Sequence, residues 1–299
     1  MTIMKYIKYL VLALIVAVMA PSCSQDKPEF NWEDADYSKA FVQVYYMALV
    51  KSNADNDIKY ITINGQEYSY DHNSMITPYN FSPSYVVGSS YATEPGKCTI
   101  KLETESGNDD DGYVRKVVYE GTTEVDVKPG IVSQVIVWDT TANAAPHVHE
   151  FGTPPLYNEV DSTGNSRFAS ARLYNYLWDA PGKPTEARLF FDVRRKSNGE
   201  IYATYPEDGV GIAFGEATDY FTTILWEDQI LGSNGYIYVR QDIRAVWPVG
   251  SELYPEGHEE ILLKNDYWST YMGRSYHYFY HGDLKGNVRS KKLTRFGAK

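Results

Sequence analysis

The sequence predicts an all-β protein with two immunoglobulin-like antiparallel β-sandwich domains in tandem after an N-terminal signal peptide. The chain holds 27 Tyr, 6 Trp and 11 Phe, and aromatic residues favour sheets over helices. Short runs of β-forming residues alternate with turn signals, and no window carries a sustained helical stripe. The same order of signals occurs on both sides of residues 141–165, a segment rich in Pro, Gly, Asn and Thr.

The N-terminus has the pattern of a secretory signal peptide. Lys5 and Lys8 lie in a short basic opening, and an apolar run over residues 9–20 follows it. The run is shorter than the roughly 20 residues that span a bilayer, which argues against the alternative of a retained transmembrane helix. We therefore expect residues 1–22 to be removed. An ordinary secreted protein that is cut near this point is the alternative to a lipoprotein.

Cys23 follows Pro21-Ser22 at the end of the apolar run. A cysteine after a small residue at this place resembles the lipobox of bacterial lipoproteins, where the thiol is diacylated and the chain is cut just before it. Ala20 stands where Leu is usual and Pro21 is atypical, a relaxed pattern similar to that of Bacteroidota lipoproteins. The resemblance implies that Cys23 is lipidated. Cys98 then remains alone in a strand, where a lone Cys is most often a small buried hydrophobe.

Residues 23–36 are acidic and aperiodic, and we expect them to act as a flexible tether. Acidic residues just after the lipidated cysteine resemble the surface-export signal of Bacteroidota lipoproteins. This implies a lipid-anchored protein of the outer membrane that faces the cell exterior, with a periplasm-facing position as the alternative.

The charge of the chain limits its partners. The formal net charge is −11, and loss of two lysines with the signal peptide makes the mature chain more acidic still. Such a charge repels phosphate, so we expect no nucleic acid partner and membrane contact through the lipid anchor only.

Four pairs of landmarks indicate two related domains, 37–140 and 166–299, joined by the linker 141–165. The pairs are 42–46 with 171–175, 64–68 with 198–202, 98–102 with 236–240, and 131–138 with 274–281. The second pair contains an Asn-Gly turn in each copy, which is the strongest short hairpin signal. Chance similarity of generic turn residues is the alternative to a duplication.

The expected strands follow from the same runs. In the first domain they are 40–47, 58–63, 85–90, 98–103, 114–119, 122–127 and 132–139. In the second domain they are 169–176, 187–194, 222–226, 235–240, 260–264 and 275–281. Residues 218–231 have room for a short helix.

Motifs of known chemistry are missing from the sequence. There is no Gly-x-Ser-x-Gly nucleophile elbow, His-Glu-x-x-His zinc helix, phosphate loop or Cys-x-x-Cys pair. We therefore expect no enzyme, no catalytic residues and no cofactor. A catalytic pair whose members lie far apart in the sequence is the alternative, because carboxylate separations cannot be judged from sequence.

Two polar clusters resemble metal ligands. The run from His147 to Glu150 places two imidazoles about 6–7 Å apart on one side of an extended chain, a spacing that can chelate a transition metal. The run from Asn108 to Asp111 concentrates oxygen atoms but lacks the spacing and closing Glu of an EF-hand. We expect a solvated linker and a polar hairpin tip instead, and no metal site.

The aromatic residues of the second domain are the candidate binding site. In the run 276–281 the three tyrosines share one face of a strand and His277, Phe279 and His281 share the other, so we expect one set to face solvent. Exposed rings stack on sugars and supply contact area without a charge to desolvate. We predict that a neutral glycan binds the aromatics nearest the loop 248–257, and the alternative is that these residues are core. The predicted ligand-binding residues are Trp247, Tyr254, Trp268 and Tyr271.

Signal peptide, lipobox, acidic tether and tandem domains whose strands follow Asn-Gly or Pro-Gly turns resemble Bacteroidota surface lipoproteins with tandem immunoglobulin-like β-sandwich repeat domains. The resemblance covers the whole chain, rests on architecture, and carries over no catalytic residue. It implies a binding or scaffolding role, often beside glycan-uptake machinery. We expect a non-enzymatic lipoprotein that binds an extracellular ligand, most of all a glycan, with a surface-complex protein as a second partner. A structural or adhesive component, pilus-related or complex-forming, is the alternative.

Overall fold

The computed structural model describes residues 36–69, 76–83, 90–106, 112, 114–151, 169–195, 197–223, 236–271 and 273–297. The predicted signal peptide, Cys23 and the tether up to residue 35 lie outside them. The chain divides into two compact units, Met1–Tyr37 and Ser38–Lys299, and nearly all described residues belong to the second. These residues form strands and turns without a helix, so none of them makes a helix that could cross a membrane. The predicted all-β fold class is confirmed.

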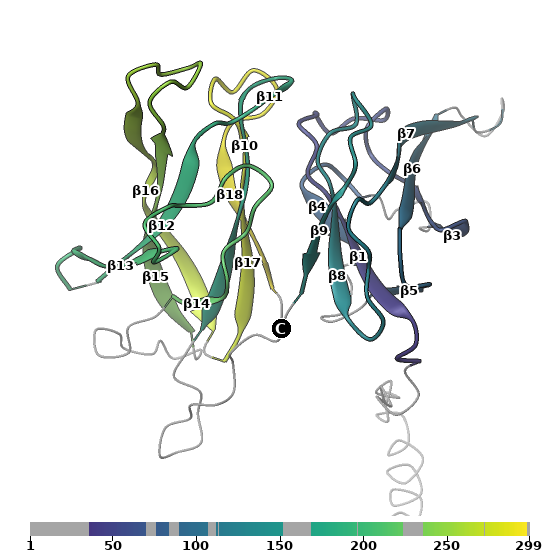
Figure 1. Cartoon of the computed structure of the whole chain (residues 1–299), viewed down its shortest axis with the longest axis horizontal. Coiled ribbons are helices and arrows are strands. Elements are labelled where there is room, and N and C mark those ends of the chain that lie inside the picture. The colour runs from purple at the N-terminus through teal and green to yellow at the C-terminus, as the bar shows by residue number, and fades with distance from the viewer. Residues whose placement is uncertain are drawn as a thin grey trace, which may run out of the picture. The chain divides into compact units, whose positions relative to one another are not determined.

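The first sandwich has two sheets around one core (Figure 1). One sheet has the order β4(Asn80–Ser82), β1(Ala40–Tyr46), β8(Val132–Val137), β9(His147–Glu150), and β5(Tyr91–Thr93) also pairs with β1. The other has the order β3(Gln66–Ser69), β2(Tyr60–Ile63), β6(Thr99–Ser106), β7(Val114–Thr122). Alternate residues of β1, such as Val42 and Val44, are fully buried between the sheets.

The second sandwich has the same plan. One sheet has the order β11(Lys183–Pro184), β10(Ser170–Ala180), β17(Ser275–Asp283), β18(Lys292–Gly297), and β14(Phe221–Thr222) also pairs with β10. The other has the order β13(Ile201–Tyr205), β12(Arg188–Arg194), β15(Tyr236–Trp247), β16(His258–Tyr271). Its core contains Leu173, Phe191 and Tyr278, which are inaccessible to solvent.

The two copies therefore share a strand order, and the four sequence landmarks fall on equivalent elements. They mark β1 and β10, the β2–β3 and β12–β13 turns, β6 and β15, and β8 and β17. At the first Asn-Gly turn both Asn64 and Gly65 have positive φ, as a two-residue hairpin of the primed type requires. The same strand topology thus occurs twice among the described residues.

One feature differs from the predicted antiparallel sandwiches. β1 pairs with β8 in parallel, and β10 pairs with β17 in parallel, at the centre of one sheet in each sandwich. Parallel strands are usually buried on both faces, and so are these: all nine residues of β17 are buried. We call the sheet with the parallel pair the central sheet of its sandwich. One face of each central sheet packs in the core of its own sandwich, and the other face contributes to a third core described below.

Several predicted elements need correction. The two strands expected at 114–119 and 122–127 are one strand, β7, and beyond it Val127 makes only an isolated bridge to Gly96. Part of the predicted linker, His147–Glu150, is strand β9, which is hydrogen-bonded to β8. The hairpin strands β15 and β16 extend well beyond the predicted 235–240 and 260–264. Several other predictions fall mostly or wholly outside the described residues: the strands at 85–90 and 222–226, the run Asn108–Asp111, and the linker after Phe151. Most of the helix expected at 218–231 also falls outside them, and its first residues, which are described, are not helical.

Cys98 is buried in the first core without a disulfide, as predicted for a small hydrophobe. Burial raises the pKa of its thiol to about 12. The residue therefore stays a neutral thiol at physiological pH.

Candidate functional site

The aromatic run of β17 does not face solvent on either side. Tyr278 and Tyr280 point into the second core, and His277, Phe279 and His281 point toward residues of the first sandwich. The prediction that one of the two sets is exposed is wrong. The physical reason is that β17 is central in its sheet and both faces of that sheet are covered.

The apolar part of this interface is a stack of rings. Phe279 lies between Tyr174 of β10, with ring centroids 4.1 Å apart, and Tyr45 of β1, at 5.2 Å. Phe296 of β18 contacts Tyr45 edge-on at 5.8 Å, and Tyr79 stacks on His281 at 4.1 Å. These contacts join β1 of the first sandwich to β10, β17 and β18 of the second.

The polar part of the interface is a chain of hydrogen bonds with one consistent direction. Gln134 of β8 accepts from the Tyr174 hydroxyl and donates through Nε2 to His277 Nδ1 at 2.8 Å. His277 then donates through Nε2 to the Tyr220 hydroxyl at 2.6 Å, and Tyr220 donates to the Phe151 carbonyl at 3.1 Å. This assignment requires a neutral imidazole with its proton on Nε2. Burial, followed by the nearby Arg172 charge, lowers the pKa of His277 to about 3, which agrees with it.

The histidine pair of the predicted linker belongs to the same interface. His147 stacks on Trp138 at 5.1 Å and lies 3.2 Å from the Tyr176 hydroxyl through Nδ1. His149 contacts the edge of the Tyr174 ring at 5.5 Å. Burial lowers the pKa of both imidazoles to about 4. The two histidines are therefore partly buried in a strand and do not belong to a solvated linker. No group of three metal-ligand side chains comes together among the described residues.

The structure separates the four predicted ligand-binding residues into two pairs. Trp247 ends β15 next to the turn of the β15–β16 hairpin, and Tyr254 lies in that turn with its ring 4.9 Å from Trp247. Trp268 pairs with Val239, eight residues back along β15, which places it about 27 Å from Trp247 along the strand. Tyr271 is farther still, so the four do not line one site.

Their exposure differs as well. Trp247 is 1% exposed and Trp268 packs against the second core, where its indole N–H donates to Asp266 and Arg295 covers its ring at 4.6 Å. Tyr254 is half-buried against the same core. Tyr271 is 39% exposed, and it alone of the four lies on the outer face of the hairpin.

Tyr271 has two exposed tyrosines beside it on that face. Tyr238 is 44% exposed and Tyr267 is 52% exposed. Tyr238 lies directly opposite Ser269, which separates Tyr267 from Tyr271 on β16, so Tyr238 is a diagonal neighbour of both. We call Tyr238, Tyr267 and Tyr271 the tyrosine strip. The sequence analysis missed its first two members, although the period-2 spacing of 267, 269 and 271 places those residues on one face.

Arginine side chains border the tyrosine strip. Arg240 lies 5.7 Å from the Tyr267 ring centroid and is held by two hydrogen bonds to Asn265 Oδ1, at 2.9 and 3.1 Å. Arg274 covers the Tyr271 ring at 4.5 Å. Each of these two rings therefore has a guanidinium group over one of its faces.

Beyond Arg240 the same outer face carries a ladder of ion pairs. Asp242 is fully buried and accepts from Arg194 Nε at 2.7 Å and from the Asn265 amide at 2.7 Å. Its cross-strand neighbour Asp192 accepts from Arg244 Nε at 3.0 Å. These carboxylates are fully engaged with protein groups. They hold the strands that carry the tyrosine strip and do not offer a free acid or base.

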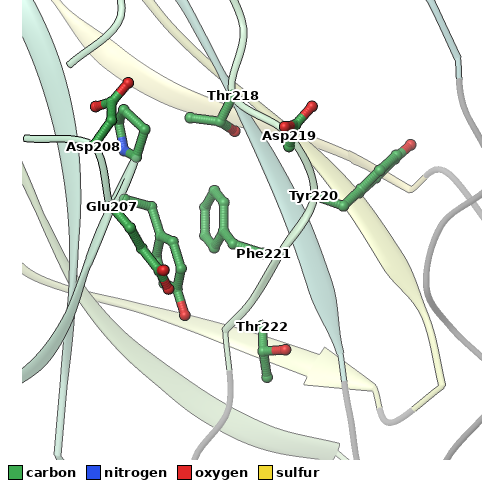
Figure 2. Close-up of a pocket in the computed structure, with 9 residues that line it drawn as sticks. Glu207, Asp208, Thr218, Asp219, Tyr220, Phe221 and Thr222 are labelled. Atoms are coloured by element: carbon green, nitrogen blue, oxygen red, sulfur yellow. The ribbon is translucent and has the colours of Figure 1, made fainter. Parts of the chain in front are cut away.

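A cavity of about 480 Å³ lies elsewhere on the second sandwich. It is lined by residues 205–208, which begin at the last residue of β13, and by 218–222, which end with β14 (Figure 2). Phe221 lies in the middle and stacks on Tyr205 with centroids 4.3 Å apart. Its volume falls in the range of small-ligand pockets.

The comparisons with known proteins add little. No protein-family model matches the chain, and the search of curated proteins gives no match. The chain is similar to a crystal structure described as "a putative cell adhesion protein from Bacteroides uniformis ATCC 8492", with 9% sequence identity over 88% of this chain and 100% of that one. The TM-score of 0.20 is too low for this likeness to carry an argument about fold or function.

Proposed function

We propose that the protein is a non-enzymatic lipoprotein of the cell surface, anchored through Cys23, that binds an extracellular neutral glycan on the tyrosine strip. The observation that carries the proposal is the exposure of Tyr238, Tyr267 and Tyr271 on one face of one hairpin. Most other described aromatic rings of this sandwich are buried in one of its two packing faces. Three large rings that stay 39–52% exposed on one surface are typical of a contact site.

The shape of the tyrosine strip suits a sugar chain. Tyr267 and Tyr271 are four residues apart on β16, so their rings are spaced by about 13 Å with the small Ser269 between them. Tyr238 approaches Ser269 from the neighbouring strand. Tyrosine offers an apolar ring for stacking and a hydroxyl for hydrogen bonds, and it loses little conformational entropy on binding. A row of such rings offers stacking area for the apolar faces of sugars, and we propose a neutral glycan as the ligand.

The test is binding of neutral oligosaccharides to the full mature chain carrying Cys23→Ala, measured by calorimetry. Tyr267→Ala and Tyr271→Ala should each weaken binding at least about tenfold, since each removes one stacked ring. Tyr37→Ala is the matched control, because Tyr37 is 56% exposed and lies outside both sandwiches. Binding that survives both strip variants, or that is lost equally in the control, contradicts the site.

A structural or adhesive role is the second candidate, and the interface between the sandwiches favours it. Ring contacts and a hydrogen bond join the two sandwiches. They are Tyr45 with Phe279, Tyr79 with His281, and Gln134 with His277. A protein built to bear load between a lipid anchor and a partner benefits from such a joint. Light scattering that shows concentration-dependent assembly, in a chain that binds no glycan, supports this role over the first.

A further inference from the structure

The cavity at Phe221 is separate from the tyrosine strip, and its walls have a different chemistry. Phe221 belongs to the second core, where it contacts Phe191 at 5.0 Å, and Tyr205 stacks on its ring at 4.3 Å. The aromatic floor is therefore fixed by the sandwich itself. Figure 2 shows Glu207 and Asp208 on one side of Phe221 and Asp219 on the other.

The charge of the cavity is entirely negative. Its nine lining residues include Glu207, Asp208 and Asp219, all exposed, and no Lys, Arg or His. None of the three forms an ion pair within the described part of the chain; Asp208 accepts a hydrogen bond from the Val210 amide at 2.8 Å. An ionised carboxylate only accepts hydrogen bonds, so the rim calls for a ligand that donates them and carries positive charge.

Two further polar side chains of the cavity are engaged within the protein. The Thr218 hydroxyl accepts from the Leu173 amide at 3.0 Å, and the Tyr220 hydroxyl is turned toward His277 and Phe151. The three rim carboxylates accept hydrogen bonds and donate none, which suits a cationic donor better than a neutral sugar. A long cationic side chain fits better, because its methylene stem packs on aromatic rings while its head group remains with carboxylates at the rim.

We propose that this cavity binds the side chain of an arginine or lysine presented by a partner protein. The stem of that side chain lies over the Tyr205–Phe221 stack, and its charged end is held by Glu207, Asp208 and Asp219. The protein then has two contact surfaces on its second sandwich, one for a neutral glycan and one for a basic residue of another protein.

The experiment uses the full mature chain carrying Cys23→Ala and the peptide Gly-Ser-Arg-Ser-Gly. The matched ligand replaces arginine by citrulline, which has nearly the same shape and no charge. Titration calorimetry at low ionic strength should show the arginine peptide binding at least about tenfold more tightly than the citrulline peptide, because cation–π and charge-assisted hydrogen bonds are lost without the charge. The preference should shrink as the salt concentration approaches about 1 M.

The site is located with two charge-matched variants. Glu207→Gln/Asp208→Asn/Asp219→Asn should abolish the preference for arginine. Glu120→Gln/Glu124→Gln/Asp126→Asn removes three exposed carboxylates from the first sandwich and should retain it. Equal binding of the two peptides overturns the proposal, and so does an equal loss in both variants, which would show a general acidic field.

The outcome is independent of the glycan proposal. Tyr267→Ala should leave arginine-peptide binding unchanged, because Tyr267 is not among the residues of the cavity. A neutral oligosaccharide that displaces the peptide from the wild-type chain would assign the cavity to sugar and refute the cationic ligand.

Discussion

The interface between the two sandwiches can be tested at two neighbouring tyrosines of one strand. Tyr45 and Tyr46 of β1 are both buried, at 1% and 0% exposure, but they point to opposite faces. Tyr45 contacts Phe279 and Phe296 of the second sandwich, whereas Tyr46 belongs to the core of the first. The two positions therefore share residue type, strand and burial, and differ only in the body that they contact.

The magnitude follows from the contacts. Truncation of a buried aromatic residue to alanine costs about 3–5 kcal/mol. One ring neighbour of Tyr45, Phe81 at 4.9 Å, lies in its own sandwich, so not all of this cost falls on the interface. We expect Tyr45→Ala to weaken association of the two sandwiches by about 2–3 kcal/mol, or about 30- to 150-fold in Kd. Tyr46→Ala should lower the melting temperature of the first sandwich and change that Kd only a few-fold.

The assay needs a chain that can be cut between the sandwiches. A specific protease site placed between Phe151 and Ala169 allows cleavage after folding, and the fragments are then diluted and their association measured by fluorescence anisotropy. The wild-type fragments should stay together during gel filtration. Separation of the wild-type fragments, or an equal loss of affinity in Tyr45→Ala and Tyr46→Ala, would refute the interface.

Three further predictions concern the whole chain. Mild proteolysis of the native protein should cut first within the predicted linker and after Phe151, since β9 is hydrogen-bonded up to that residue, and the fragments should co-elute; a cut before His147 contradicts this. In the folded protein the pKa is about 4 for His147 and His149 and about 3 for His277, below the ordinary value of a histidine. The stability that these neutral imidazoles contribute is therefore present above about pH 6.5 and is lost as the pH falls toward 4. Urea unfolding should therefore show a loss of several kcal/mol between pH 7 and 5, with a shallower slope in His277→Phe. Cys23→Ala expressed in the native host should leave the detergent phase for the aqueous phase; persistence with membranes contradicts lipidation at Cys23.

Local signals account for what the sequence predicted well. The Asn64–Gly65 turn and the alternation of Val42 and Val44 depend on backbone conformation and on the period of a strand, and both are visible within a few residues. For this reason the landmark pairs fall on equivalent strands. The short strands β4, β5, β11 and β14 had no such signal, because they have two or three residues and are defined only by their partners.

The interface between the sandwiches was beyond such reasoning. A strand with one wet face alternates apolar and polar residues, and His277, Phe279 and His281 were assigned to such an alternation. The run contains no charged residue from Ser275 to Gly282, and this is the signal that both faces are buried. Likewise, tryptophans were taken as exposed platforms, but Trp247 and Trp268 pack on the core, where large rings gain most from burial.

The positions of the two candidate sites follow from this arrangement. In each copy the central sheet is covered on both faces, so substitutions there disturb a core or the interface. The other sheet has one face free, and that is where the copies differ: β6 and β7 have 8 and 9 residues, whereas β15 and β16 have 12 and 14. Tyr267 and Tyr271 lie on β16 of this longer hairpin, and residues of β13 and β14 line the cavity. Variation between the two sandwiches is least costly in these outer elements, and both binding proposals place the ligand there.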